Sequence, residues 1–214
     1  MKDRDMSNLE QPQIYLITPS EFELSSFSKV LSNVLDAHEI ACLRLSLATN
    51  DEDRVLRTAD ALRELTHARD IAMVIDSHVL MVERLGLDGV HLTDGSRNVR
   101  KVRDELGADA IVGAYCGQSR HDGMNAGEYG ADYVCFGPVG ETSLGDGERA
   151  EAELFDWWSQ MIEVPIVAEG NIGDNEFKSL APITDFFAVG DEIWRTDDPV
   201  ARLSEINALI ASGL

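Results

Sequence analysis

The sequence predicts a single compact (β/α)8 TIM barrel, and two observations carry this prediction. Eight apolar runs of strand length alternate with segments whose apolar residues recur at helical spacing, and no long insertion interrupts the alternation. Strands that are apolar throughout and separated by helices are typical of parallel sheets buried on both faces. An open, doubly wound sheet is the alternative, but no G-x-G-x-x-G turn follows the first run, which disfavours it.

The predicted strands are short apolar runs bounded by polar or glycine-rich sequence: Ile14–Thr18, Ala41–Leu45, Ile71–Asp76, Gly89–Leu92, Ala110–Ala114, Tyr133–Phe136, Ile166–Ala168 and Phe186–Val189. Between the first three, helical spacing places apolar side chains on one face, namely Phe27, Val30, Leu31, Val34 and Leu35, then Val55, Leu56, Ala59, Leu62 and Leu65. The last helix, predicted over 199–212, opens with a proline in its first turn.

A short signature, Gly-x-Asp, precedes three of the strands, at 86–88, 107–109 and 130–132. Each Gly is predicted to end a helix in the left-handed conformation, and each Asp to open the next strand. Residues 1–13 are polar and are expected to form a flexible N-terminal segment. The barrel domain is therefore predicted to cover residues 14–214.

Charge and composition exclude several functions. The chain has 39 Asp and Glu against 18 Lys and Arg, a formal net charge of −21, which opposes binding to nucleic acid or to an anionic membrane. The N-terminus lacks the apolar core of a signal peptide, and no run approaches the roughly 20 apolar residues of a membrane span, so a cytoplasmic location is expected. Three scattered cysteines without a C-x-x-C indicate neither a disulfide framework nor a zinc site.

In a barrel of this kind, function is expected where the strands end. Phosphate is commonly bound there by backbone N–H groups of glycine-rich loops after strands seven and eight, where Gly170-Asn171 and Gly190 stand. Three acids, Glu169, Asp191 and Glu192, adjoin these glycines. Like charges about 4 Å apart cost on the order of 1 to 4 kcal/mol each, so phosphate should bind only if the acids point away or a cation intervenes.

Other charged residues also stand at predicted strand ends. Arg44 ends a buried strand and needs a partner, either a substrate phosphate or a carboxylate such as Asp76. The acids of the mouth could hold a divalent cation through Asp76, Asp94, Glu141 or Asp191, or could favour a cationic ligand. His91 is predicted to be a hydrogen-bonded core residue. His121 is predicted to lie in the first turn of a helix that Ser119 caps.

Several motifs resemble, in order and spacing, the thiamin phosphate synthase family and its relatives, the thiazole tautomerases. They are YLIT at 15–18, LR at 43–44, LDGVHL at 87–92, GADYVCFGPV at 130–139 with Thr142 close behind, and PIVAEGNI at 165–172. The resemblance covers roughly residues 14–194 and implies a (β/α)8 barrel of thiamin biosynthesis. The implied activity is that of a transferase, which couples hydroxymethylpyrimidine diphosphate with thiazole phosphate and releases pyrophosphate, with Mg2+ on the diphosphate.

The resemblance also implies site residues. Substrate and phosphate groups would be bound by Tyr15, Arg44, Tyr115, Thr142, Gly170, Asn171 and Gly190, and Mg2+ by Asp76, with Asp94 replacing a second metal-binding Asp whose position is taken by Ser96. The chain departs from the family pattern where Ser46 and Gly145 stand at two lysines, and Asp191 stands at a phosphate-facing serine. Without those lysines, less stabilisation of the departing pyrophosphate is expected.

Three alternatives follow from these departures. The barrel could be a non-catalytic binder of a cationic heterocycle or a regulatory protein. It could be a thiazole tautomerase-like isomerase, with His121 as general acid/base because Gly117 stands at the family's histidine. It could also be a metal-assisted lyase or isomerase with an oxygen-rich site of Asp76, Glu169 and Asp191. Arg44 and His121 are thus the candidate catalytic residues, the partner is a small-molecule substrate, and a homodimer is left open.

Overall fold

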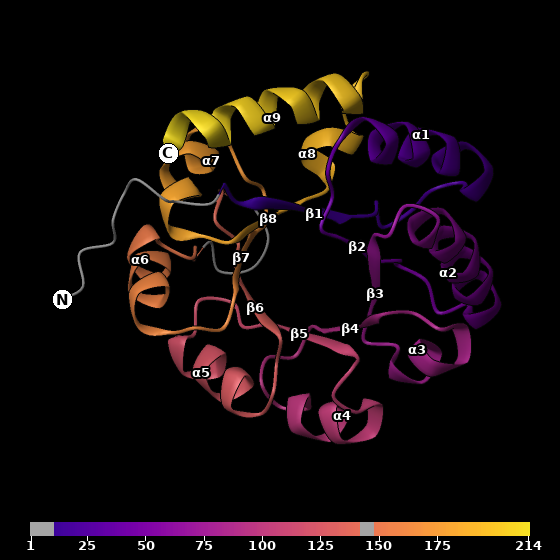
Figure 1. Ribbon diagram of the computed structural model, residues 1–214, viewed down its shortest axis with the longest axis horizontal. Coiled ribbons are helices and arrows are strands. Elements are labelled where there is room, and N and C mark those ends of the chain that lie inside the picture. Colours follow the sequence, from indigo (N-terminus) through magenta and orange to yellow (C-terminus); the bar gives the residue numbers. More distant parts are fainter. Residues whose placement is uncertain (1–10, 142–147) are drawn as a thin grey trace.

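A closed barrel of eight parallel strands forms the centre of the computed structural model, which describes residues 11–141 and 148–214 (Figure 1). Each strand pairs with its neighbours in the sequence, and β8 closes the ring by pairing with β1. A ring of helices covers the outside of the barrel. The predicted (β/α)8 barrel is confirmed. No helix in the described part of the chain is long and apolar enough to cross a membrane.

The strands agree with the predicted runs to within one residue at each end. They are β1 Gln13–Ile17, β2 Cys42–Leu45, β3 Ala72–Asp76, β4 Gly89–Leu92, β5 Ile111–Tyr115, β6 Tyr133–Phe136, β7 Ile166–Glu169 and β8 Phe186–Val189. The helices are α1 Leu24–Ala37, α2 Glu52–His67, α3 Val79–Leu85, α4 Val99–Leu106, α5 Arg120–Glu128, α6 Ala152–Met161, α7 Asp174–Leu180, α8 Asp191–Trp194 and α9 Pro199–Gly213, with a 3-10 turn η2 Ala181–Ile183.

Alternation along the strands divides the core into two layers, because successive side chains of a strand point to opposite faces. On β1, Leu16 packs outward against the helices, while Tyr15 points into the barrel. The inward layer contains Tyr15, Cys42, Val74, Tyr133, Cys135, Val167 and Ala188. All three cysteines are buried free thiols.

The Gly-x-Asp signature closes the end of the barrel where strands begin. Asp88 and Asp132 each stand one residue before a strand, and their carboxylates accept the backbone N–H of Met73 and Val112 at 2.7 Å. Asp185, outside the predicted signature, does the same for Ile166 at 2.8 Å. The prediction is wrong for Asp109, which is exposed and separated from β5 by Ala110.

The glycines of the signature also differ. Gly86 ends α3 in the left-handed conformation, with φ 65° and ψ 42°. Gly107 has φ 80° but ψ −173°, so it is not left-handed helical, and Gly130 has φ 97°. Each φ is positive, which explains the glycines, but the predicted helix cap is confirmed only at Gly86.

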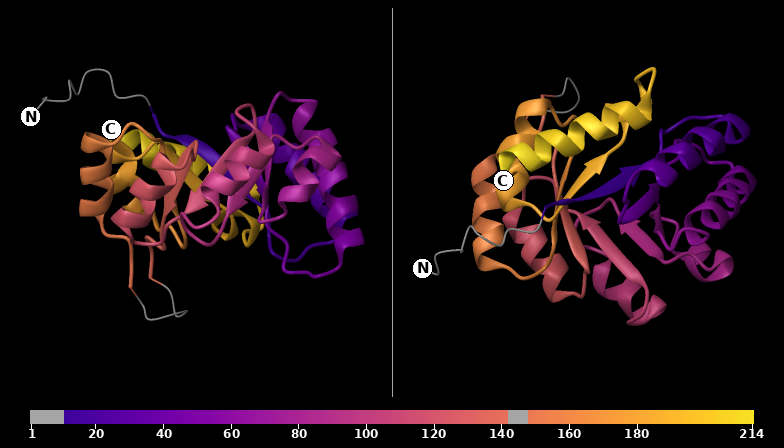
Figure 2. Two further views of the ribbon diagram at one scale, coloured as in Figure 1. Left: turned by 90° about the horizontal axis from the view of Figure 1, so that it is seen from below. Right: turned by 45° about the horizontal axis from the view of Figure 1, so that its top comes forward.

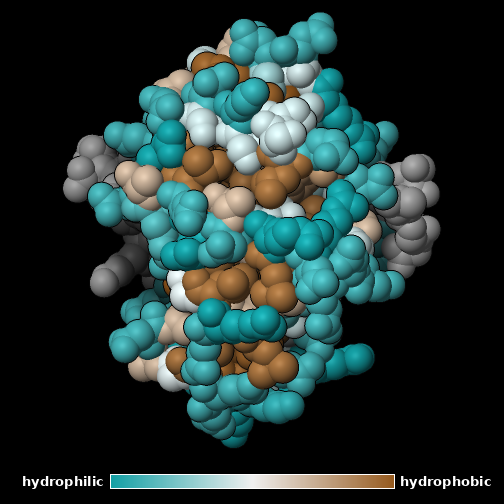
Figure 3. Space-filling model, turned by 90° about the vertical axis from the view of Figure 1, so that its right-hand side faces the viewer, coloured by the Kyte–Doolittle hydropathy of each residue, from teal (hydrophilic) through white to brown (hydrophobic). Residues whose placement is uncertain are grey.

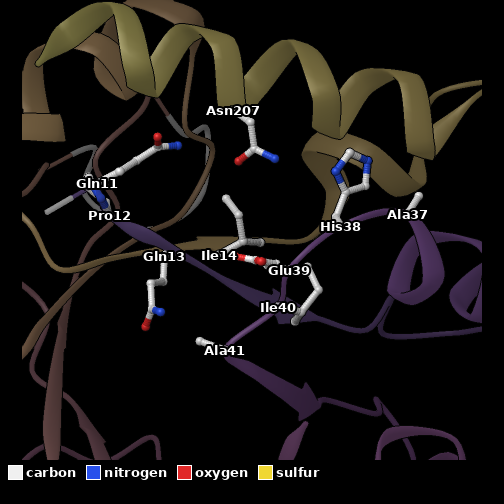
Figure 4. Close-up of a pocket in the computed structure, with 10 residues that line it drawn as sticks. All are labelled: Gln11, Pro12, Gln13, Ile14, Ala37, His38, Glu39, Ile40, Ala41 and Asn207. Carbon is white, nitrogen blue, oxygen red and sulfur yellow. The ribbon is translucent and has the colours of Figure 1, made fainter. Parts of the chain in front are cut away.

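Several hollows lie at the end where the strands begin, and two of them border β1. One, of ≈ 490 Å³, lies between the start of β1, the α1–β2 connection and α9, and is shown with its lining residues in Figure 4. The other, of ≈ 250 Å³, is mostly apolar and includes Tyr15, Tyr133 and Phe186 in its wall. Both lie at the end opposite to the C-terminal ends of the strands. Barrel active sites are found at those C-terminal ends.

Apolar side chains are also visible on one outer face. Figure 3 shows bands of them over α1, α2 and α3, between rows of polar residues. Leu80 on α3 is 80% exposed, and Val30 on α1 is exposed as well.

In Figure 2 (left), the segments on either side of residues 142–147 project from the end of the barrel at which the strands finish. This is the end at which barrel enzymes have their active sites.

Candidate active site at the C-terminal end of the barrel

Arg44 lies at the mouth of the barrel and forms ion pairs with two carboxylates. Its side chain comes from β2, is 5% exposed and binds Glu169 of β7 through two hydrogen bonds, Nη1 to Oε2 at 2.9 Å and Nη2 to Oε1 at 2.5 Å. Its Nε lies 3.3 Å from Oδ1 of Asp76 on β3, in an ion pair whose geometry is not that of a hydrogen bond. The sequence predicts Asp76 as a partner but not Glu169.

Charge and burial act against one another in this cluster. Burial by itself lowers the pKa of Arg44, but the carboxylates of Glu169 and Asp76 raise it, and the resulting pKa lies well above its ordinary value. Burial raises the pKa of Asp76, although Arg44 opposes this. Arg44 is therefore always charged, and its charge offsets buried carboxylates of the protein.

Below this cluster, a chain of hydrogen bonds crosses the barrel interior. The hydroxyls of Tyr15 and Tyr133 lie 2.7 Å apart, and Nδ1 of His91 lies 3.0 Å from the Tyr133 hydroxyl. Burial lowers the pKa of His91 far below its ordinary value and raises those of both tyrosines far above theirs, so all three are neutral. His91 is thus a hydrogen-bonded core residue, and Tyr15 lies beneath the mouth rather than at its surface.

A cavity at the C-terminal end has a volume of ≈ 780 Å³ and opens beside Asp76. Its wall includes Ser77, His78, Thr93 and Thr49. Ser77 has φ 56°, an uncommon conformation for a residue with a Cβ, and its hydroxyl lies 3.2 Å from that of Thr93. Oxygen-bearing side chains therefore gather on one side of this cavity.

The loops after β6 and β7 are joined to one another. The N–H of Gly140 donates to the carbonyl of Gly170 at 3.0 Å, and a Cβ on Gly140 would lie 1.6 Å from the carbonyl oxygen of Asn171. Asn171, with φ 51°, donates its side-chain amide to the carbonyl of Glu141. On the facing side, Tyr115 donates to the carbonyl of Gly137 at 2.7 Å, and burial raises the pKa of Tyr115 to about 12. Thr142 lies outside the described residues.

The acids that adjoin Gly170 and Gly190 have three different partners. Glu169 is neutralised by Arg44. Asp191 is exposed and forms an ion pair with Arg195, Nη2 to Oδ2 at 2.5 Å. Glu192 is directed at backbone N–H groups, because its Oε2 accepts from Gly190 at 2.8 Å and its Oε1 from Ile172 at 3.0 Å. The expected crowding of the phosphate position thus comes from Glu192.

The two predicted metal ligands have different surroundings. Asp94 is exposed and accepts a hydrogen bond from Asn98 at 2.6 Å, whereas Asp76 lies at the cavity. Ser96 is buried and donates to Asp122 of α5 at 3.1 Å, which brings a carboxylate beside the position of the missing acid. Asp76 with the hydroxyls of the cavity is the oxygen-rich set that a hard cation such as Mg2+ requires.

One group of three potential metal ligands occurs within the described residues. A ligand atom of His91, Cys135 and Glu169 each lies within 4.8 Å of the others. Both oxygens of Glu169 are held by Arg44, so this carboxylate already has its counter-charge.

The histidine of the first turn of α5 lies where the sequence predicts it, and a second histidine lies at the mouth. His121 is exposed on α5, where its Nε2 lies 3.2 Å from the side-chain amide of Asn125. Ser119 caps this helix, as predicted. His78 instead faces the cavity, with Nδ1 2.6 Å from the carbonyl of Asp76. His78 stands two residues after β3, which is the sequence signal for a place at the mouth, whereas no sequence pattern indicates the contacts of Asp122 and Glu192.

Comparison with known proteins gives one consistent result. The family model described as thiamine monophosphate synthase matches residues 14–193. The thiamine-phosphate synthase of Rhodospirillum centenum is 38% identical over 201 residues, which cover 92% of this chain and 97% of that protein. That of Hyphomonas neptunium is 35% identical over 222 residues, with 97% and 99% covered.

Solved structures agree in fold. Thiamine phosphate pyrophosphorylase from Pyrococcus furiosus superposes with a TM-score of 0.81 at 21% identity, covering 94% of this chain and 96% of that one. Orotidine 5'-phosphate decarboxylase from Pyrococcus horikoshii superposes with a TM-score of 0.67 at 15% identity, covering 92% and 99%. At these identities the structures show a shared barrel architecture.

Proposed function

Because the chain belongs to the thiamine monophosphate synthase family, we propose that it couples a pyrimidine diphosphate to a thiazole at the C-terminal end of its barrel. The name shared by its relatives supports this reaction. The observation that carries the proposal is the ≈ 780 Å³ cavity with Asp76 in its wall, which lies where barrel enzymes hold their substrates.

The reaction requires little acid or base catalysis from the protein. The thiazole ring nitrogen forms a C–N bond to the methylene carbon of the pyrimidine with its lone pair, while the bond from that carbon to the diphosphate oxygen breaks and pyrophosphate leaves with the electron pair. The attacking nitrogen carries no proton, so no general base is needed. Positioning of the two rings and support of the leaving group are then the tasks of the site.

Asp76, Ser77 and Thr93 are the residues we assign to the diphosphate end of the cavity. A Mg2+ ion carried by the diphosphate would be held by the Asp76 carboxylate, and would supply positive charge to the departing pyrophosphate. Arg44 is assigned a positioning role, because its guanidinium fixes Asp76 and Glu169. Tyr115 and Gly170 belong to the joined loops on another side of the mouth, where Tyr115 donates to Gly137 and Gly170 accepts from Gly140.

The test is a coupling assay. The protein is incubated with hydroxymethylpyrimidine diphosphate, Mg2+ and either thiazole phosphate or the thiazole alcohol, and both the coupled product and pyrophosphate are measured. We expect product, its loss on addition of EDTA, and a fall in kcat of at least about tenfold in Asp76→Asn, because this substitution removes the carboxylate that would hold Mg2+ at the leaving group. Circular dichroism verifies that the variant is folded.

Absence of product with both thiazoles, from folded protein, would contradict the proposal. A tautomerase-like isomerase would then be the second candidate, because His78 lies at the cavity where a general acid/base is needed. Binding of thiamin itself, measured by calorimetry under the same conditions, would identify the binder of a cationic heterocycle instead.

A further inference from the structure

Glu192 places a carboxylate where barrels of this kind offer backbone N–H groups to a phosphate. One oxygen accepts the N–H of Gly190 after β8, and the other accepts the N–H of Ile172 after β7, at 2.8 and 3.0 Å. The two donors come from separate loops, and converge on a single anionic group. This is the hydrogen-bonding arrangement that a phosphate receives at the ends of strands seven and eight.

No described lysine stands at this end to offset a second anion. Lys29 lies on α1, Lys101 on α4 and Lys178 on α7, all on the helical ring. Arg44 is bound to Glu169, and Arg195 pairs with Asp191. A phosphate that entered beside Glu192 would therefore meet a like charge, and would have to displace that carboxylate from two hydrogen bonds.

We propose that Glu192 is an internal substitute for phosphate. If the proposed coupling reaction holds, the thiazole bound at this end carries a free hydroxyl. The product is then thiamin instead of thiamin phosphate. The bonds made and broken are those of the proposed reaction, since the side chain of the thiazole takes no part in them. A hydroxyl suits the site because each carboxylate oxygen retains a lone pair that can accept a hydrogen bond from it.

Substrate preference tests this assignment. With wild-type protein, kcat/KM for the thiazole alcohol should exceed that for thiazole phosphate by at least about tenfold. Glu192→Ala removes the carboxylate and leaves room, so the preference should reverse. Glu192→Gln removes the charge but retains the bulk, so it should not gain use of the phosphate. Asp191→Ala changes the net charge equally, away from the two N–H groups, and should keep the wild-type preference.

A binding experiment gives an answer even if no coupling occurs. Inorganic phosphate is titrated into 15N-labelled protein, and the amide resonances of Gly190 and Ile172 are followed, with sodium chloride at matched ionic strength as the control. We expect shifts of both amides in Glu192→Ala, together with a rise in its Tm, and no saturable shift in the wild type. The rise in Tm also shows that the variant is folded.

Two results would overturn the inference. One is a wild-type preference for thiazole phosphate over the alcohol. The other is saturable binding of phosphate to the Gly190 and Ile172 amides of the wild type, which would show that Glu192 gives way. Failure of the coupling reaction with both thiazoles would count against the proposed function alone, because the phosphate titration does not depend on turnover.

Discussion

At the scale of single residues, Arg44 is a positive charge that lies in the candidate site but is paired with carboxylates of the protein itself. Two of its nitrogens bind Glu169 and a third faces Asp76, so the guanidinium is surrounded by carboxylates from two other strands. Removing one partner of a buried ion pair leaves the others uncompensated in a poorly hydrated place.

Arg44→Met should therefore destabilise the protein by about 3–5 kcal/mol, because two partly buried carboxylates lose their counter-charge. Urea unfolding followed by circular dichroism measures the change. Arg195→Met is the matched control, since its ion pair with Asp191 is exposed and contributes little. Equal effects of the two substitutions would show that the Arg44 cluster has no special stabilising role.

The sequence predicts only part of this site, for a reason that particular residues make clear. The need of Arg44 for a partner follows from its place at the end of a buried strand. Asp76 is foreseeable because β2 and β3 pair directly, but β2 and β7 are not neighbours in the sheet, and Glu169 reaches Arg44 only because the barrel is closed. The choice of Glu192, and not Asp191, to face the N–H groups depends on rotamers that no sequence pattern specifies.

At the scale of elements, the starts of β3, β5 and β7 are fixed by more than their own apolar runs. The carboxylate of Asp132 joins two strands, since it opens β6 and accepts the N–H of Val112 on β5. It also pairs with Arg103 of α4, whose guanidinium donates to the carbonyl of Gly130. One side chain thus ties two strands and a helix together.

Asp132→Ala should lower the free energy of unfolding by about 1–3 kcal/mol, because the Val112 N–H and Arg103 lose an acceptor. Asp109→Ala is the control from the same sequence signature, and should change stability little because Asp109 is exposed and does not adjoin a strand. Thermal and urea unfolding of both variants decide the matter. A larger loss in the Asp109 variant would refute this role of the carboxylate.

The elements themselves are largely readable from sequence. Strands buried on both faces must be apolar throughout, and the predicted runs match all eight strands. The connections are less readable, because their hydrogen bonds depend on which loops meet. The joining of Gly140 to Gly170, for example, follows from the pairing of β6 with β7 and from the absence of side chains at both positions.

At the scale of the whole molecule, the resemblance seen in the sequence is confirmed over the same range, since the family match spans residues 14–193. The net charge of −21 has a consequence of its own. So much excess negative charge on one barrel repels itself, and salt screens this repulsion over a Debye length of about 10 Å at 0.1 M.

We expect the Tm to rise when sodium chloride is increased from about 0.01 to 0.3 M, because screening weakens repulsion more in the compact state than in the expanded one. Differential scanning calorimetry at several salt concentrations measures this. A fall of Tm with salt would mean that attractive pairs such as those of Arg44 outweigh the net repulsion.

Trp194 gives the molecule an optical reporter beside Glu192. The indole follows Glu192 by two residues on α8, donates to the carbonyl of Ile17 at 2.6 Å and meets the ring of Phe27 edge-on, with centroids 5.1 Å apart. The other two tryptophans, Trp157 and Trp158, lie on α6. With those two replaced by phenylalanine, the tryptophan fluorescence of the protein would come from Trp194 alone, and its emission would follow any displacement of α8 as ligands arrive.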